Sequence, residues 1–154
     1  MDLQTIKIRL YRNDDWGSLC NIHDESRPGE LEGNVPLNAF IPLRKCAENE
    51  GLFDDEVWVA ELDIVVGFIA FEKDYVNWLY VHPSYQRKGI GRKLLRFALE
   101  RMDYPIKVSL LSNNHRAFNL YEKEGFSIIK TKKGKLSGNE KYDAEGHIME
   151  KDSC

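Results

Sequence analysis

Apolar and polar positions alternate in two different rhythms along the chain. A repeat of two positions, or a short continuous apolar run, is typical of strands, and a repeat of three to four positions is typical of helices. The first pattern predicts strands over 5–10, 57–61, 65–72, 75–81, 106–111, 126–131 and 146–151. The second predicts helices over 13–26, 38–50, 90–102 and 113–125.

Helix caps and breakers refine the ends of these elements. The Ser-Arg-Pro-Gly segment at 26–29 is expected to end the first helix. Asn113 or Asn114 can cap the last helix through its side-chain oxygen, and Gly125 stands where a left-handed residue commonly ends a helix. Residues 132–145 are rich in lysine and glycine, so we expect a polar loop there, and the sequence leaves its order open.

The order of the elements predicts the class of fold. Strands 57–61 and 65–72 are typical of a hairpin, and strand 75–81 is expected to run antiparallel to its neighbour. A helix separates strand 75–81 from strand 106–111, which favours a parallel pair with a right-handed crossover. We therefore expect an α/β protein with a mixed sheet. The length of 154 residues suits one domain over 1–154.

Composition and charge exclude several classes of protein. The net charge of −3 argues against general nucleic-acid binding. Residues 1–5 contain neither a basic nor an apolar segment, so we expect no secretory signal. The longest apolar stretch, 57–71, is interrupted by Glu61 and Asp63 and cannot span a bilayer.

Cysteine and histidine positions bear on redox and metal chemistry. An odd number of widely spaced cysteines favours free thiols in a reducing compartment, and hence a cytoplasmic protein. These cysteines are Cys20, Cys46 and Cys154. The histidines show no metal-ligand spacing with them, so we expect no metal and place the histidines at the surface or around the site. They are His23, His82, His115 and His147.

Charge is distributed unevenly along the chain. Acidic residues dominate from Asp14 to Asp63, and basic residues dominate from Arg87 to Arg101. A cationic substrate that meets an anionic cofactor would suit this division. Charged helix faces in contact with water would explain it equally well.

The stretch 78–95 carries the strongest functional signal. An apolar strand stops at Pro83, a loop with Gly89 and Gly91 follows, and a helix begins near Ile90. The first N–H groups of a helix have no partner inside it, and together with the helix dipole they can bind an anion. Glycine lets that backbone approach a ligand closely. Four cations lie beside this turn, namely Arg87, Lys88, Arg92 and Lys93. We therefore expect a bound phosphate or pyrophosphate.

Two common phosphate-binding motifs do not fit this loop. It lacks both Gly-x-Gly-x-x-Gly and Gly-Lys-Ser/Thr. Residues 86–91, Gln-Arg-Lys-Gly-Ile-Gly, instead resemble the acetyl-CoA loop of the GNAT N-acetyltransferase superfamily, Gln/Arg-x-x-Gly-x-Gly/Ala. The preceding strand, Leu-Tyr-Val-x-Pro at 79–83, is similar to that family too. A different phosphate binder, such as a nucleotide-binding domain, is the alternative.

A second segment resembles the same superfamily. Residues 114–126 match its pattern Asn-x-x-Ala-x-x-x-Tyr-x-x-x-Gly-Phe, one strand after the loop. The matching positions are Asn114, Ala117, Tyr121, Gly125 and Phe126. The resemblance covers about 57–126.

The resemblance implies a fold and a cofactor. The fold is a single-domain GNAT-like α/β fold, with a mixed central sheet of about seven strands splayed between strands four and five, and about four helices. The co-substrate is acetyl-CoA, with its pantetheine arm in the gap and its pyrophosphate on the loop. The residues implied to bind it are Leu79, Tyr80, Val81, Gln86, Arg87, Lys88, Gly89, Ile90, Gly91, Arg92 and Asn114.

Acetyl transfer to an amine requires a proton for the departing thiolate. The ordinary pKa of tyrosine is about 10 and that of a free thiol about 8.5, so a tyrosine can supply this proton. Tyr121 matches the family motif, and we assign it as the general acid. Backbone N–H groups near Tyr80 could stabilise charge on the carbonyl oxygen. The alternative for Tyr121 is a half-buried tyrosine of the core.

The general base and the acceptor remain open. Some family members use a glutamate on the strand before the second motif, but residues 107–111 contain no acid. Candidate bases elsewhere are Glu72, Asp74, Asp24 and Glu25. Candidate acceptor-binding residues are Asp24, Glu25, Asn77 and Trp78.

The expected function is an acetyl-CoA-dependent N-acetyltransferase. It would move an acetyl group directly to an amine of a small molecule, peptide or protein, without a covalent acetyl-enzyme. A non-catalytic acyl-CoA-binding sensor with the same fold is the alternative. The expected partners are acetyl-CoA and an amine acceptor, with a homodimer as an option and without nucleic acid or membrane.

Overall fold

The computed structural model describes residues 5–32, 36–136 and 139–154. Residues 1–4, 33–35 and 137–138 lie outside the described part. The expectation of no secretory signal falls mostly on these residues, and the loop expected at 132–145 falls on them in part.

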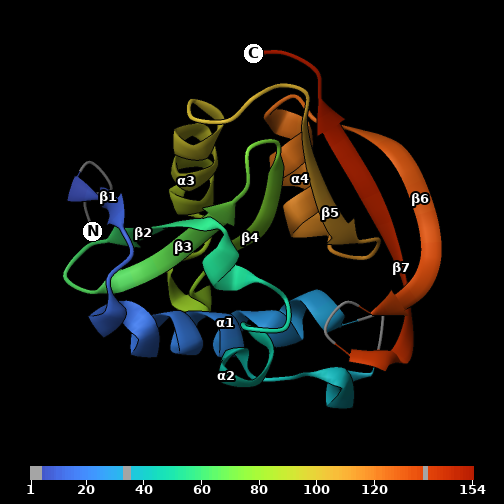
Figure 1. Cartoon of the computed structure of the whole chain (residues 1–154), viewed down its shortest axis with the longest axis horizontal. Helices are drawn as coiled ribbons and strands as arrows, with labels where there is room; N and C mark the ends of the chain where they lie inside the picture. Colours follow the sequence, from blue (N-terminus) through green and yellow to red (C-terminus); the bar gives the residue numbers. More distant parts are fainter. Residues whose placement is uncertain (1–4, 33–35, 137–138) are drawn as a thin grey trace.

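The described strands form one mixed sheet of seven strands in the order β1-β2-β3-β4-β5-β7-β6 (Figure 1). All neighbouring strands are antiparallel except β4 and β5, which are parallel. The α/β class, the mixed sheet and the parallel pair are therefore confirmed. The strands are β1 (Lys7–Leu10), β2 (Glu56–Glu61), β3 (Val65–Phe71), β4 (Tyr75–Val81), β5 (Ile106–Leu111), β6 (Ser127–Leu136) and β7 (Asn139–Lys151).

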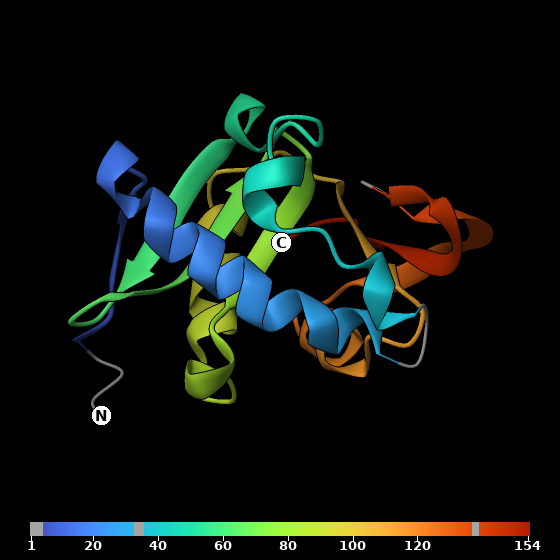
Figure 2. The same ribbon diagram turned by 90° about the horizontal axis from the view of Figure 1, so that it is seen from below.

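Four α-helices are described, and they cover both faces of the sheet (Figure 2). Leu19 and Ile22 of α1 belong to a buried cluster on one face, together with residues of α2. Leu94 and Leu95 of α3 and Tyr121 of α4 belong to a cluster on the other face. The helices are α1 (Trp16–Leu31), α2 (Leu43–Cys46), α3 (Ile90–Leu99) and α4 (His115–Lys123). None of them has the length and apolar character needed to cross a membrane.

The prediction that residues 26–29 end the first helix is wrong. Helix α1 continues through Pro28 to Leu31. Burial explains this continuation, because Ser26 packs under β4 and Leu31 is 1% exposed. Tertiary packing of this face therefore overrides the local preference of proline and glycine.

The predicted helix over 38–50 is much shorter in the structure. Only Leu43–Cys46 form an α-helix, after a single turn of 3-10 helix at Leu37–Ala39. Pro42 explains the late start, because the residue before a proline avoids the helical region and proline suits the start of a helix.

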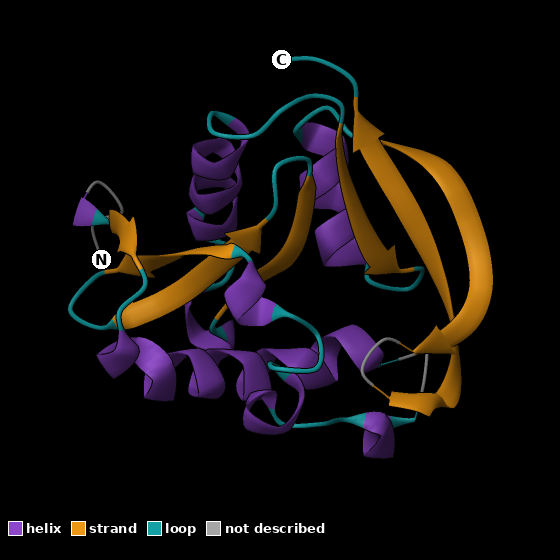
Figure 3. Cartoon of the chain, in the orientation of Figure 1, coloured by secondary structure: helices purple, strands orange, loops and turns teal. Residues whose placement is uncertain are grey.

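The prediction of a polar loop over 132–145 is also wrong. The described residues of this range, 132–136 and 139–145, belong to β6 and β7, which pair as an extended hairpin and are drawn as two long strands in Figure 3. Nine of the ten residues of β6 are exposed, which explains their lysine-rich composition. Lysines are common on edge strands because they oppose pairing with other chains.

The sheet splays between β4 and β5, as expected. These strands pair only at Tyr75 with Lys107 and at Val76 with Val108. Immediately afterwards β4 has one extra residue relative to β3, since Ala70 faces Trp78 while Phe71 faces Val76. Such a bulge bends a strand, and it accounts for the separation of β4 from β5 beyond Val76.

Candidate active site

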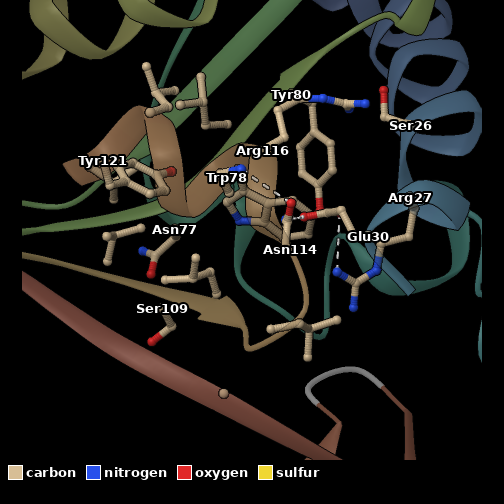
Figure 4. A pocket seen from close by; sticks show the side chains of 18 of the residues that line it. Ser26, Arg27, Glu30, Asn77, Trp78, Tyr80, Ser109, Asn114, Arg116 and Tyr121 are labelled. Atoms are coloured by element: carbon tan, nitrogen blue, oxygen red, sulfur yellow. Dashed lines mark hydrogen bonds and ion pairs between the residues drawn. The ribbon is translucent and has the colours of Figure 1, made fainter. Parts of the chain in front are cut away.

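The splayed strands open into a cavity of about 1090 Å³ (Figure 4). Its walls come from α1, β4, β5, the start of α3, α4 and the β6–β7 hairpin. Segments far apart in the sequence therefore meet in one space.

The loop between β4 and α3 exposes main-chain N–H groups at one end of this cavity. Arg87 has φ 64° and Gly89 has φ 83°, both left-handed, and Ile90 begins α3. No side chain caps this helix start. A left-handed turn leading into an uncapped helix directs several N–H groups toward one point, which suits an anion. The left-handed Arg87 is a strained conformation that the sequence did not reveal.

Gln86 lines the cavity, but its side chain is engaged by the protein. Its Nε2 donates to the carbonyl oxygen of Val81 at 2.9 Å, and Ser26 Oγ donates to the same oxygen at 3.0 Å. Gln86 thus ties the loop to the end of β4. Its side chain is not free to serve the phosphate role that the family resemblance implied.

Most other residues of the predicted cofactor site also line the cavity. They are Leu79, Tyr80, Val81, Arg87, Gly89, Ile90, Gly91, Arg92 and Asn114. Lys88 does not line it, and its side chain is exposed. The Arg92 side chain is 46% exposed, and its Nε lies 3.6 Å from Glu124 Oε2, so part of its charge is neutralised.

The edge of β4 offers main-chain groups to the gap. His82 N–H donates to the Val66 carbonyl of β3 at 2.9 Å. Alternate residues of an antiparallel strand direct N–H and C=O toward the same neighbour, so those of Leu79 and Val81 face β5. The Val81 carbonyl already accepts hydrogen bonds from Ser26 and Gln86. The N–H and C=O groups of Leu79 and the N–H group of Val81 are therefore left for a ligand.

Tyr121 lies in the same cavity, as the motif predicted. The residue is 5% exposed, and its ring packs edge-on against Phe126 with 5.4 Å between centroids. In Figure 4 its hydroxyl points into the pocket on the side of Trp78 and Asn77. Burial, and then the Glu30 carboxylate, raise the pKa of Tyr121, so the phenol keeps its proton at neutral pH.

Asn114 holds the start of α4 under Tyr121. Its Oδ1 accepts a hydrogen bond from the Ala117 N–H at 3.3 Å, which confirms the predicted cap. Its Nδ2 donates to Glu30 Oε2 at 3.4 Å. Both ends of the amide therefore bond within the protein.

A charged network that the sequence analysis missed lies across from Tyr121. Arg27 Nη1 donates to Glu30 Oε1 at 3.2 Å, and the Tyr80 hydroxyl is hydrogen-bonded to Glu30. Burial, followed by the Glu30 charge, holds the pKa of Tyr80 well above its ordinary value. Figure 4 shows Glu30 between Tyr80 and Arg27. The spacing of Arg27 and Glu30 places them on one helix face, but the expected break at 26–29 hid that signal.

Two of the four predicted acceptor residues, Asn77 and Trp78, line the cavity, and Asp24 and Glu25 do not. Asp24 Oδ1 accepts the Leu43 N–H at 2.9 Å and lies 3.0 Å from His23 Nδ1, so it caps α2. Glu25 is exposed on α1. His23 is 3% exposed and packs on Tyr80, so it takes the second of its two expected places, around the site.

The other candidate bases also lie outside the cavity lining. Glu72 accepts a hydrogen bond from Asn77 Nδ2 at 2.8 Å, and neither Glu72 nor Asp74 lines the cavity. The carboxylates that do line it are Glu30 and Glu50. Within the described part of the chain, no group of three His, Cys, Asp or Glu residues could hold a metal ion.

Comparison with known proteins identifies the family. Residues 53–128 match the family model "Acetyltransferase (GNAT) domain". N-alpha-acetyltransferase 50 of Danio rerio is 30% identical over 123 residues, which cover 67% of this chain and 72% of that protein. The chain therefore belongs to the GNAT acetyltransferase family.

Two further relatives extend over most of the chain. The uncharacterized N-acetyltransferase YafP of Escherichia coli (strain K12) is 24% identical over 141 residues, covering 88% of this chain and 91% of that one. The structure of yncA, a putative acetyltransferase from Salmonella typhimurium solved with its cofactor acetyl-CoA, has a TM-score of 0.69 at 21% identity, covering 96% of this chain and 93% of that chain. The acetyl-CoA bound to that neighbour agrees with the co-substrate that the motifs implied for this chain.

Proposed function

We propose that this protein transfers the acetyl group of acetyl-CoA directly to an amine, with Tyr121 as the proton donor. The observation that carries the proposal is one cavity that joins three features: the N–H groups before α3, the free edge of β4 and the hydroxyl of Tyr121. A phosphate-binding turn, an extended slot and a proton donor are what this reaction requires.

The main-chain hydrogen-bonding groups that face the cavity fit acetyl-CoA. The N–H groups of residues 87–92 suit a diphosphate, and the Leu79 and Val81 edge suits an amide-containing arm. A Cβ on Gly91 would lie 3.6 Å from Leu120 and 3.8 Å from Val81, so the turn runs close to both neighbours. When bound, acetyl-CoA supplies a thioester whose acetyl carbon forms a C–N bond with the amine as the C–S bond breaks.

Tyr121 keeps a proton at its oxygen for the departing sulfur. Its raised pKa keeps the phenol neutral, and the same burial raises the pKa of a thiol in the cavity. Proton transfer between them therefore stays accessible. The amine must enter neutral, and once the C–N bond has formed its nitrogen loses one proton, to water or through the carboxylates Glu30 and Glu50.

Thiol release from acetyl-CoA across a panel of amines tests the proposal, with calorimetry of acetyl-CoA and ATP binding alongside. We expect tight binding of acetyl-CoA, weak binding of ATP and amine-dependent thiol release. Binding of acetyl-CoA without turnover on any amine would favour the sensor. Preference for ATP would favour a nucleotide-binding domain.

A further inference from the structure

The acceptor end of the cavity is confined by the β6–β7 hairpin. Leu136 of this hairpin forms a buried cluster with Leu31 of α1 and with Ala39. Tyr142 and Ala144 of β7 pack against the same cluster. The hairpin, α1 and the segment before α2 therefore meet at this end of the cavity.

An ion pair whose side chains are fixed by neighbouring residues lines this end of the cavity. The side chains of Arg27 and Glu30 are 19% and 25% exposed, so both reach the cavity while their stems are covered. Glu30 is fixed by Asn114 and by Tyr80, and it in turn fixes Arg27. The guanidinium of arginine carries five N–H donors in a planar fork, and its bond to Glu30 at 3.2 Å uses one of them. Arg27 thus keeps donors for a further anion.

The two charges differ in their position relative to the reacting centre. Glu30 lies on the side of Tyr121, since it bonds to the cap of α4 and its charge contributes to the raised pKa of Tyr121. Arg27 extends from α1 on the other side of Glu30 (Figure 4). Lys132 and Lys135 of β6 line the cavity as well, and Lys135 is paired with Asp143 at 2.7 Å. The charge of Lys135 is thus balanced by Asp143, and Arg27 is the cation that lies beside Glu30.

We infer that the acceptor is a small molecule whose amine and carboxylate lie close together, as in a free amino acid. Its amine lies on the Glu30 side, toward Tyr121, and its carboxylate binds the fork of Arg27. A carboxylate matches the guanidinium fork through two parallel hydrogen bonds, and such charge-assisted pairs are the strong ones. This inference rests on the proposed acetyl transfer and names its substrate class.

The wild-type protein provides the first test. Thiol release from acetyl-CoA is measured with free amino acids, with their α-carboxamides, with the corresponding decarboxylated amines, and with lysine peptides blocked at both termini. We expect kcat/KM for the best free amino acid to exceed that for its carboxamide by about tenfold or more, because the carboxamide loses the charge-assisted bonds. Blocked lysine peptides should give no release above background.

Variants of Arg27 provide the second test. In Arg27→Gln we expect the preference for the free amino acid over its carboxamide to fall to about one, mostly through KM, while acetyl-CoA affinity stays unchanged. Arg27→Lys should keep part of the preference, because it retains the charge and loses the fork. Arg44→Gln, on the exposed face of α2 and outside the cavity lining, is the matched control and should keep the preference intact.

The outcomes separate this inference from the proposed function. Turnover of carboxamides or peptides in preference to free amino acids would overturn the inference and leave the acetyl transfer standing. An Arg27→Gln variant that binds acetyl-CoA normally but lowers kcat/KM equally for the free amino acid and its carboxamide would also overturn it, since Arg27 would then have a structural role only. A protein that binds acetyl-CoA but releases no thiol with any of the acceptors would overturn the acetyl transfer itself, and this inference with it.

Discussion

Gly67 of β3 lies where the chain leaves no room for a side chain. A Cβ at this position would lie 2.9 Å from the carbonyl oxygen of Tyr80 and 3.3 Å from side-chain atoms of Leu94 and Val81. The missing side chain lets α3 and β4 pack closely on β3. It therefore helps to place both the phosphate turn and the edge of β4.

We expect Gly67→Ala to lower the free energy of unfolding by about 1–3 kcal/mol, as is usual for overpacking in a core. Urea denaturation measures this change. Gly134→Ala is the control, because nothing lies within 4 Å of a Cβ there. Equal stability of the two variants would contradict the close packing of Gly67.

The site residues that the sequence revealed belong to short local motifs. Tyr121 follows Asn114 within a single helix, so their spacing alone places them together. The helix start at Ile90 and the left-handed Gly125 were equally local signals, and both are confirmed. The role of Gln86 was different, because its side chain bonds to Val81 of a neighbouring element and no spacing encodes that choice.

Among the elements, β1 and the turn that precedes α1 are joined by a buried ion pair. The Arg9 guanidinium donates to both oxygens of Asp15, at 2.9 and 2.8 Å, and also to Glu61 of β2. The Asp15 side chain is 6% exposed. Hydrogen bonds from Arg9 lower the pKa of Asp15 below its ordinary value. A carboxyl group whose pKa is lowered by folding stabilises the protein above its unfolded pKa, and this contribution is lost as the pH falls through the folded pKa.

We expect Asp15→Asn to lower the free energy of unfolding by about 2 kcal/mol at pH 7, because Arg9 loses a charged partner. The difference from the wild type should shrink as the pH falls below about 4, the ordinary pKa of aspartate, because Asp15 itself then becomes protonated. Urea titrations across this range measure it. Asp14→Asn is the control, since the Asp14 side chain is 78% exposed. A deficit that stays constant with pH would contradict the role of the ion pair.

The elements that the sequence misjudged are those whose shape depends on distant contacts. Helix α1 passes through Pro28 because its last turn is buried, and the hairpin of β6 and β7 forms because β7 pairs with β5. Local composition indicated a break in the first case and a loop in the second. Arg27 and Glu30 were missed for this reason, since they lie beyond the expected end of the helix.

At the scale of the whole molecule, the site is assembled from segments that are far apart in the chain. Helix α1 supplies Arg27 and Glu30, β4 supplies its free edge, α4 supplies Tyr121, and the β6–β7 hairpin confines the acceptor end. The family motifs predicted the cofactor half of this assembly. The acceptor half lies in the less typical first and last segments, where the resemblance ended. The dimer and the cytoplasmic location stay predictions.

The central claim is that Tyr121 protonates the departing thiolate in the gap between β4 and β5. It is tested most directly by the single-turnover rate of thiol release in Tyr121→Phe, at saturating acetyl-CoA and with the best acceptor. Tyr11→Phe, outside the cavity lining, is the matched control. We predict a rate about 10²-fold or more below the wild type, with acetyl-CoA affinity unchanged by calorimetry. An unchanged rate would contradict the account.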